Sequence, residues 1–131
     1  MINPEKTQFM IIDDSPMNNL ICEKTIRLFS PDVSITAFTD PQVGLDYINS
    51  NYNTPFPIET VLLLDINMPV LSGWDVLERF KDFPDFIREQ FKIYILTSSI
   101  NVADKQKADN NPLVCGLLGK PITMTQLESM F

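Results

Sequence analysis

The chain has 131 residues, of which 44% are hydrophobic and 21% charged, a composition typical of one globular domain with a single core. Its net charge of −7 argues against direct binding of nucleic acid, and no apolar run is long enough to cross a membrane. The absence of histidine excludes Ser-His and Cys-His catalysis and most zinc sites.

The first strand and helix are predicted from the N-terminal residues. An apolar run over 8–12 predicts a buried strand that ends at Asp13 and Asp14. Ser15 followed by a proline is typical of a helix start, because a serine caps the helix and proline has no N–H to leave unpaired. Four apolar residues at helical spacing are expected to form the buried face of this helix: Met17, Leu20, Ile21 and Leu28.

The middle of the chain predicts a second strand over 33–38 and a second helix that begins at Asp40 and the proline after it. A polar, proline-containing loop is expected over 49–57. Four branched apolar residues over 61–64 then lead to Asp65, and such a run suits a strand that is covered on both faces. A carboxylate at its end lies at the rim where open α/β sheets bind ligands.

The next segments are less regular. A third helix is predicted over 72–80, and 83–91 is expected to be a packed irregular segment or a short extra helix whose aromatic residues belong to the core. A fourth strand over 92–97 ends at the hydroxyl of Thr97. The helix predicted over 101–110 has only Val102, Ala103 and Ala108 to bury, so it should be lightly anchored.

The C-terminal segment predicts a fifth strand over 113–118, followed by Lys120. Thr123 and Gln126 form a capping-box pattern that opens a last short helix ending at 131. Five strands that alternate with helices predict an α/β fold: a doubly wound five-stranded parallel sheet in the flavodoxin-like order 2-1-3-4-5, with helices on both faces.

Polar side chains follow four of the five predicted strands, and they are Asp13, Asp14, Asp65, Thr97 and Lys120. Strands one and three are neighbours in the predicted order, so the three carboxylates should converge. At roughly 4 Å and an effective dielectric constant near 20, each pair of carboxylates repels by about 4 kcal/mol. A cation is therefore expected among them, and Mg²⁺ is the ion usually held by carboxylates, a carbonyl, waters and a phosphoryl oxygen.

Together these motifs resemble the receiver domain of two-component response regulators, of the stand-alone type found in chemotaxis. The resemblance rests on the order and spacing of four markers: Asp13-Asp14, the Leu-Asp-x-x-Met-Pro turn over 64–69 with Gly73 beyond it, Thr97-Ser98, and Lys120-Pro121. It covers essentially the whole chain, so residues 1–131 are expected to form one receiver domain without an output domain.

The resemblance implies a role for each acidic residue. Asp65 would be the nucleophile that takes a phosphoryl group from a phosphohistidine. Mg²⁺ would be the cofactor, bound directly by Asp14, Asp65 and the backbone carbonyl of Asn67, with Asp13 acting mainly through water. These are the expected site residues.

The resemblance also implies that Thr97 and Lys120 neutralise the phosphoryl oxygens. The chain would catalyse only its own phosphoryl uptake and autodephosphorylation. The expected partners are a histidine kinase or histidine phosphotransfer protein and a downstream protein target, with no nucleic acid and no membrane, in the cytoplasm. The target would bind the face made by the fourth helix (101–110), the fifth strand (113–118) and the fifth helix (123–131).

One position departs from the family pattern. Leu117 stands three residues before Lys120, where the family usually places a Tyr, Phe or His that rotates inward on activation. The signal is therefore expected to pass through Thr97 into the 101–110 helix. The alternative function is an unphosphorylated docking module with the receiver fold, although such a module has no need to keep repelling carboxylates together. Both cysteines, Cys22 and Cys115, are expected to be reduced core thiols.

Overall fold

The computed structural model describes residues 3–53 and 58–131, and its centre is a parallel sheet in the order β2-β1-β3-β4-β5. The strands are β1 (Thr7–Ile12), β2 (Ser34–Phe38), β3 (Glu59–Asp65), β4 (Phe91–Thr97) and β5 (Val114–Gly119). The doubly wound order predicted from the sequence is therefore confirmed.

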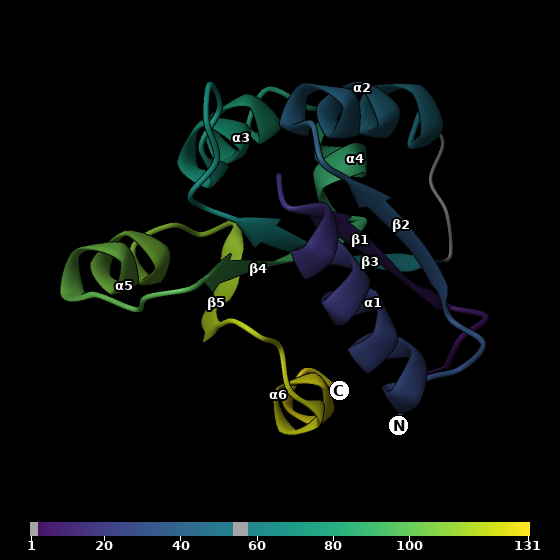
Figure 1. Cartoon of the computed structure of the whole chain (residues 1–131). Coiled ribbons are helices and arrows are strands. Elements are labelled where there is room, and N and C mark those ends of the chain that lie inside the picture. The colour runs from purple at the N-terminus through teal and green to yellow at the C-terminus, as the bar shows by residue number, and fades with distance from the viewer. Residues whose placement is uncertain (1–2, 54–57) are drawn as a thin grey trace.

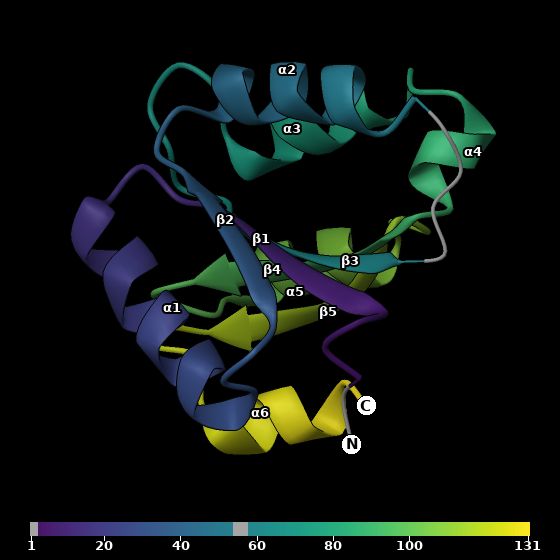
Figure 2. The ribbon, with the colours of Figure 1, turned by 90° about the vertical axis from the view of Figure 1, so that its right-hand side faces the viewer.

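The described residues form six helices: α1 (Pro16–Phe29), α2 (Pro41–Asn51), α3 (Gly73–Phe80), α4 (Asp85–Arg88), α5 (Val102–Asp109) and α6 (Met124–Ser129). Helices α2 and α3 cover one face of the sheet, and α1 and α6 cover the other (Figures 1 and 2). The short α4 is the extra helix that the sequence allowed, so the predicted fourth and fifth helices are α5 and α6. No described helix is long and apolar enough to cross a membrane.

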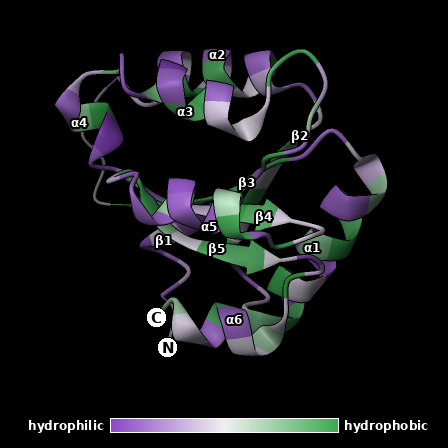
Figure 3. Cartoon of the chain, turned by 90° about the vertical axis from the view of Figure 1, so that its left-hand side faces the viewer, coloured by the Kyte–Doolittle hydropathy of each residue, from purple (hydrophilic) through white to green (hydrophobic). Residues whose placement is uncertain are grey.

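The core lies on both faces of the sheet because side chains alternate along each strand. In β3, Leu62 and Leu64 pack against α2 and α3, whereas Val61 and Leu63 pack toward α1 and α6. All four are 0% exposed. Figure 3 shows hydrophobic stretches in the central strands β4 and β5, and a mixture of hydrophilic and hydrophobic stretches in the helices.

The predicted helix starts are confirmed, and they set the direction in which each helix leaves its loop. The side chain of Ser15 accepts a hydrogen bond from the Asn18 N–H, and Asp40 caps α2 in the same way. The capping box predicted at Thr123 opens α6, and a second capping box, which was not predicted, joins Ser72 and Asp75 at the start of α3.

The buried face predicted for α1 is wrong. Met17, Leu20, Ile21 and Leu28 are between 42% and 76% exposed, and the residues that face the sheet are Asn19, Cys22 and Ile26. The four predicted residues and the three observed ones both have helical spacing. The prediction chose the four because they are all apolar, whereas the observed face includes an asparagine. The helix is instead turned so that Asn19 hydrogen-bonds to the ends of two strands.

Several smaller predictions of burial are also wrong. Phe86 is 38% exposed, and α5 buries Ala108 while Val102 and Ala103 lie at the surface. Cys115 is exposed because the β4–β5 pairing has an irregularity there: Ile93 pairs with Val114 and Tyr94 with Gly116, which leaves Cys115 as an extra residue. Of the loop predicted over 49–57, residues 49–51 continue α2, and 54–57 lie outside the described residues.

Candidate functional site

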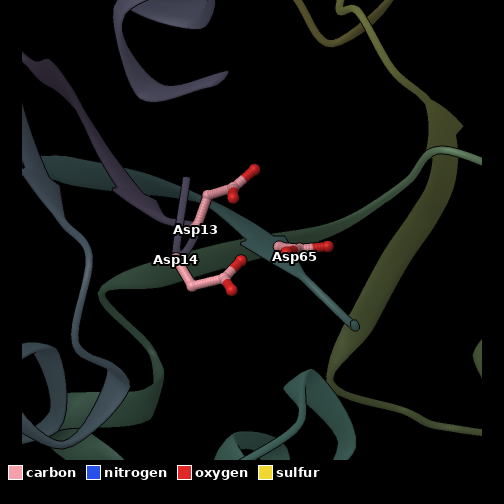
Figure 4. Close-up of side chains that lie close together, drawn as sticks. All are labelled: Asp13, Asp14 and Asp65. Atoms are coloured by element: carbon pink, nitrogen blue, oxygen red, sulfur yellow. The ribbon is translucent and has the colours of Figure 1, made fainter. Parts of the chain in front are cut away.

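Three carboxylates meet at the carboxyl end of the sheet. Asp13 and Asp14 follow β1, and Asp65 ends the neighbouring strand β3. One oxygen from each of the three lies within 4.8 Å of the others, and Figure 4 shows the side chains grouped together. Asp13 and Asp65 are each only 2% exposed, whereas Asp14 faces the solvent. The predicted convergence of the acidic residues is confirmed.

Lys120 supplies a positive charge to this acidic cluster from the loop after β5. Its Nζ lies 2.7 Å from Asp13 Oδ2 and 3.0 Å from Asp65 Oδ1. The backbone N–H of Lys120 donates to the carbonyl of Thr97 at 2.8 Å, which ties the loop to the end of β4. The ammonium is therefore placed by two neighbouring strands and shared between two carboxylates.

Burial and charge change the acidity of these groups. Burial raises the pKa of Asp65, the hydrogen bond from Lys120 opposes that rise, and the nearby charge of Asp13 adds to it, so the pKa lies above its ordinary value. Burial alone would lower the pKa of Lys120, but its hydrogen bonds to Asp13 and Asp65 raise it overall. One ammonium thus stays charged beside carboxylates that it only partly neutralises.

Asp65 is held by its own loop. Its Oδ1 accepts a hydrogen bond from the Asn67 N–H at 3.2 Å, in addition to the contact with Lys120, and no hydrogen bond from a described residue reaches Oδ2. Gly73 closes this loop against the strand, because a Cβ on Gly73 would lie 2.5 Å from the Asp65 carbonyl oxygen. The glycine is therefore needed for α3 to begin beside Asp65.

Thr97 is buried at the end of β4, but its hydroxyl is engaged elsewhere. Its Oγ1 donates to the carbonyl of Ser99 at 3.0 Å and accepts from the Ser99 N–H at 3.2 Å. None of its described hydrogen bonds reaches the carboxylates. The structure thus places Thr97 at the predicted strand end, with its hydroxyl turned into its own loop.

A cavity of about 260 Å³ adjoins the acidic cluster between α1 and the loop after β5. Its polar lining is Asp13, Asn18, Ser98 and Lys120, and its apolar lining includes Ile21 and Cys22 of α1. Burial raises the pKa of Cys22 to about 12, and the charge of Asp13 adds to the rise, so this thiol is neutral. The cavity is therefore largely apolar and opens beside the carboxylates.

Two features of the site were not predicted from the sequence. Asn19 hydrogen-bonds to the backbone of Asp13, and Lys107 of α5 lies over the ring of Trp74, with its Nζ 5.6 Å from the ring centroid. An asparagine within a helix, five residues after Asp14, was the available signal for the first feature, because asparagine is unfavourable there. The second joins residues that are distant in sequence.

The family model for the response regulator receiver domain matches residues 9–131. The chain is similar to the response regulator Rcp1 of Synechocystis, with 26% identity over 105 residues, which cover 78% of this chain and 68% of Rcp1. It is also similar to stress response regulator protein 1 of Meyerozyma guilliermondii, with 33% identity over 86 residues, 66% of this chain and 37% of that protein.

Solved structures agree on the fold. A response regulator receiver protein from Dyadobacter fermentans superposes with a TM-score of 0.82 at 28% identity, over 95% of this chain and 94% of that chain. A two-component response regulator from Cytophaga hutchinsonii gives a TM-score of 0.87 at 24% identity, over 95% and 93% of the two chains.

Proposed function

Because the chain belongs to the response regulator receiver family and is a phosphoacceptor of two-component signalling, we propose that Asp65 is the residue that takes the phosphoryl group. The observation that carries this proposal is the position of Asp65, buried at the end of β3 between two further carboxylates and Lys120. These 131 residues contain no histidine, so they do not themselves supply the phosphohistidine.

In the proposed transfer, Oδ2 of Asp65 attacks the phosphorus atom of the phosphohistidine. A P–O bond forms, the P–N bond breaks, and the donor leaves with a free imidazole that takes up a proton. Oδ1 is already bound by Lys120 and by the Asn67 N–H, which leaves Oδ2 as the oxygen free to attack. The half-buried ammonium of Lys120 then faces the negative charge of the product.

We propose Mg²⁺ as the cofactor. The acidic cluster offers only hard oxygen donors, which suit this ion, and its charge exceeds what one lysine neutralises. Asp14, Asp65 and the backbone carbonyl of Asn67 would bind the ion directly, and Asp13 would act through water. When bound, Mg²⁺ supplies positive charge to the phosphoryl oxygens.

Lys120 and Thr97 are proposed to stabilise the phosphorylated state. Lys120 would pair with a phosphoryl oxygen, and Thr97 would leave its hydrogen bonds with Ser99 to donate to another. Movement of Thr97 would pull on the loop that leads into α5, which is a route for the signal that needs no aromatic residue at Leu117. A water that attacks the phosphorus atom would break the P–O bond to Asp65 and release inorganic phosphate, which would return the protein to its resting state, and we propose no other enzymatic activity.

Two partner surfaces are proposed. The downstream target would bind the face of α5, β5 and α6, as the family resemblance implies. The phosphodonor would dock on the apolar row of α1, which consists of the exposed residues Met17, Leu20, Ile21 and Leu28. This row begins at the cavity beside the acidic cluster, since Ile21 belongs to both. A single receiver domain over 1–131 and a cytoplasmic location remain predictions.

The test is intact-mass spectrometry after incubation with acetyl phosphate, with and without Mg²⁺. The wild type should gain one phosphoryl increment only when Mg²⁺ is present, and Asp65→Asn should gain none. Asp32→Asn is the matched control, because Asp32 is an exposed carboxylate outside the acidic cluster. An increment that survives in Asp65→Asn would refute the assignment of the phosphoacceptor. No increment in the folded wild type, with a histidine kinase failing as well, would favour the docking module.

A further inference from the structure

Asn19 lies where a helix normally buries an apolar residue. It faces the sheet from α1 and is 6% exposed, in line with Cys22 and Ile26 on the same face. A buried amide in a helix interior is unfavourable unless its polar atoms are paired. The presence of Asn19 at this position therefore calls for a specific contact.

That contact is with the backbone of the acidic loop. The Nδ2 of Asn19 lies 3.0 Å from the carbonyl oxygen of Asp13 and 3.4 Å from that of Phe38, the last residue of β2. The Phe38 carbonyl also accepts from the Asp13 N–H at 3.1 Å. One amide group thus joins α1 to the ends of two neighbouring strands.

The hydrogen bond to the Asp13 carbonyl bears directly on Asp14. That carbonyl and the N–H of Asp14 belong to one planar peptide unit, so fixing the carbonyl fixes the plane from which Asp14 projects. The side chain of Asp13 is separately held by the Ser15 N–H at 2.9 Å and by Lys120 at 2.7 Å. Asp14 is exposed, and among the described residues none hydrogen-bonds to its side chain.

The other end of the Asn19 amide argues against a role in packing alone. Its Oδ1 is buried and has no hydrogen-bond partner among the described residues. Leaving a buried acceptor unpaired is costly, and an aliphatic residue would avoid that cost while filling similar space. We infer that the residue at position 19 is asparagine because its Nδ2 donates these hydrogen bonds.

We propose that Asn19 is a positioning residue that holds the peptide between Asp13 and Asp14, and so fixes Asp14 for binding a divalent cation. This inference rests on the proposed Mg²⁺ site and names a residue outside the expected ligands that sets its affinity. Residues that orient metal ligands typically change affinity by roughly 10-fold to 100-fold when they are replaced.

The experiment is calorimetric titration of Mg²⁺ into the wild type, Asn19→Leu and Asn19→Ala, with each protein's unfolding curve measured alongside. Leucine has a volume similar to that of asparagine, and alanine is too small to crowd its neighbours. If one of the two variants fails to fold, the other can still be measured. The control is Thr60→Val, because Thr60 is 0% exposed and hydrogen-bonds to Tyr52 and Gln8 at the opposite end of the sheet.

The expected result is a Mg²⁺ dissociation constant about tenfold higher in the Asn19 variants. Thr60→Val should lose stability and keep the wild-type dissociation constant within twofold. Phosphoryl uptake from acetyl phosphate should fall in the Asn19 variants at limiting Mg²⁺ and recover at saturating Mg²⁺. If the Asn19 variants bind Mg²⁺ as the wild type does, the positioning role is refuted and the metal site stands. If the wild type binds no Mg²⁺, the metal site and this inference both fall.

Discussion

The ammonium of Lys120 lies 3.0 Å from Oδ1 of Asp65, so the proposed phosphoacceptor is ion-paired before any phosphoryl group arrives. The same ammonium is 2.7 Å from Asp13, and Asp14 completes the group of three carboxylates. One ammonium therefore pairs with two of the three carboxylates, and the remaining negative charge has consequences for stability that can be measured.

Replacing Asp65 by asparagine should stabilise the protein in the absence of metal. The pKa of Asp65 is raised, chiefly by burial, so the folded protein holds this proton more tightly than the unfolded chain. Stability is therefore lost as pH rises from the ordinary pKa of 3.8 through the folded value, and the loss persists at neutral pH. We expect Asp65→Asn to raise the free energy of unfolding by about 1 to 2 kcal/mol at pH 7. The measurement is urea unfolding of both proteins with EDTA present to remove metal ions.

The gain from Asp65→Asn should shrink as the pH falls toward and below the ordinary pKa of 3.8, because the carboxyl of the folded wild type then takes up a proton. A variant that is less stable than the wild type at pH 7 would mean that the pairing of Asp65 with Lys120 outweighs burial and repulsion.

Mg²⁺ should stabilise the folded wild type by mass action. At a Mg²⁺ concentration about 100 times the dissociation constant, the expected gain in the free energy of unfolding is about 2.7 kcal/mol. Asp14→Asn should lose most of this gain, because Asp14 is the solvent-facing member of the acidic cluster. Urea unfolding with and without Mg²⁺ measures the effect. Asp32→Asn should keep the full gain, and an equal loss in that control would point to nonspecific screening by salt.

Val70 carries backbone strain beside the site. Its φ is 67°, in the left-handed region that a β-branched residue rarely adopts, and the Leu71 N–H donates to the Pro69 carbonyl across it at 2.8 Å. The side chain is 99% exposed, so no packing is lost when it is removed. Val70→Gly should therefore raise the free energy of unfolding by about 1 kcal/mol.

Val43→Gly is the matched control for Val70. Val43 is 50% exposed on α2, where glycine should instead cost about 1 kcal/mol. Thermal or urea unfolding of both variants gives the comparison. Equal destabilisation by the two substitutions would show that Val70 is not strained.

The two cysteines should differ in reactivity. Cys115 is exposed, whereas Cys22 is 6% exposed and has a pKa of about 12, raised by burial and by Asp13. Iodoacetamide at pH 8 should label one thiol of the native protein and two in urea, because the thiolate is the reactive form. Peptide mapping should place the native label on Cys115. Rapid native labelling of Cys22 would show that the helix α1 opens readily.

The apolar row of α1 should matter for transfer from a protein donor and not for a small-molecule donor. Leu20→Lys adds charge to a residue that is 48% exposed, so folding and acetyl phosphate labelling should be unchanged. Transfer from a histidine kinase that phosphorylates the wild type should slow about tenfold, which corresponds to about 1.4 kcal/mol of lost docking energy. Val102→Lys on α5, where Val102 is 72% exposed, is the control, and equal rates in both variants would refute the docking surface.

The strands and their ends could be predicted because their signals are local. The apolar run that stops at Asp65 has no helical period, and proline after a capping residue marks each of the first two helices. The convergence of Asp13, Asp14 and Asp65 then followed from the strand order alone. For the acidic cluster, only the distances between the side chains had to come from the structure.

The parts that could not be predicted depend on contacts between distant segments. The rotation of α1 is set by hydrogen bonds from Asn19 to Asp13 and Phe38. The pattern of apolar residues along the helix cannot predict these hydrogen bonds. The exposure of Cys115 follows from an irregular pairing between two strands. The hydrogen bonds of Thr97 with Ser99 depend on the local path of a loop, for which the sequence has no clear pattern.

Helix α5 contributes little to the core, since Ala108 is its one buried residue, and it packs chiefly against β5. Substitutions at exposed positions of this kind usually change stability by no more than about 0.5 kcal/mol. Selection for folding therefore places little constraint on the outer residues of α5. After gene duplication, two copies can diverge there and acquire separate targets while both keep the same strands and the same carboxylates.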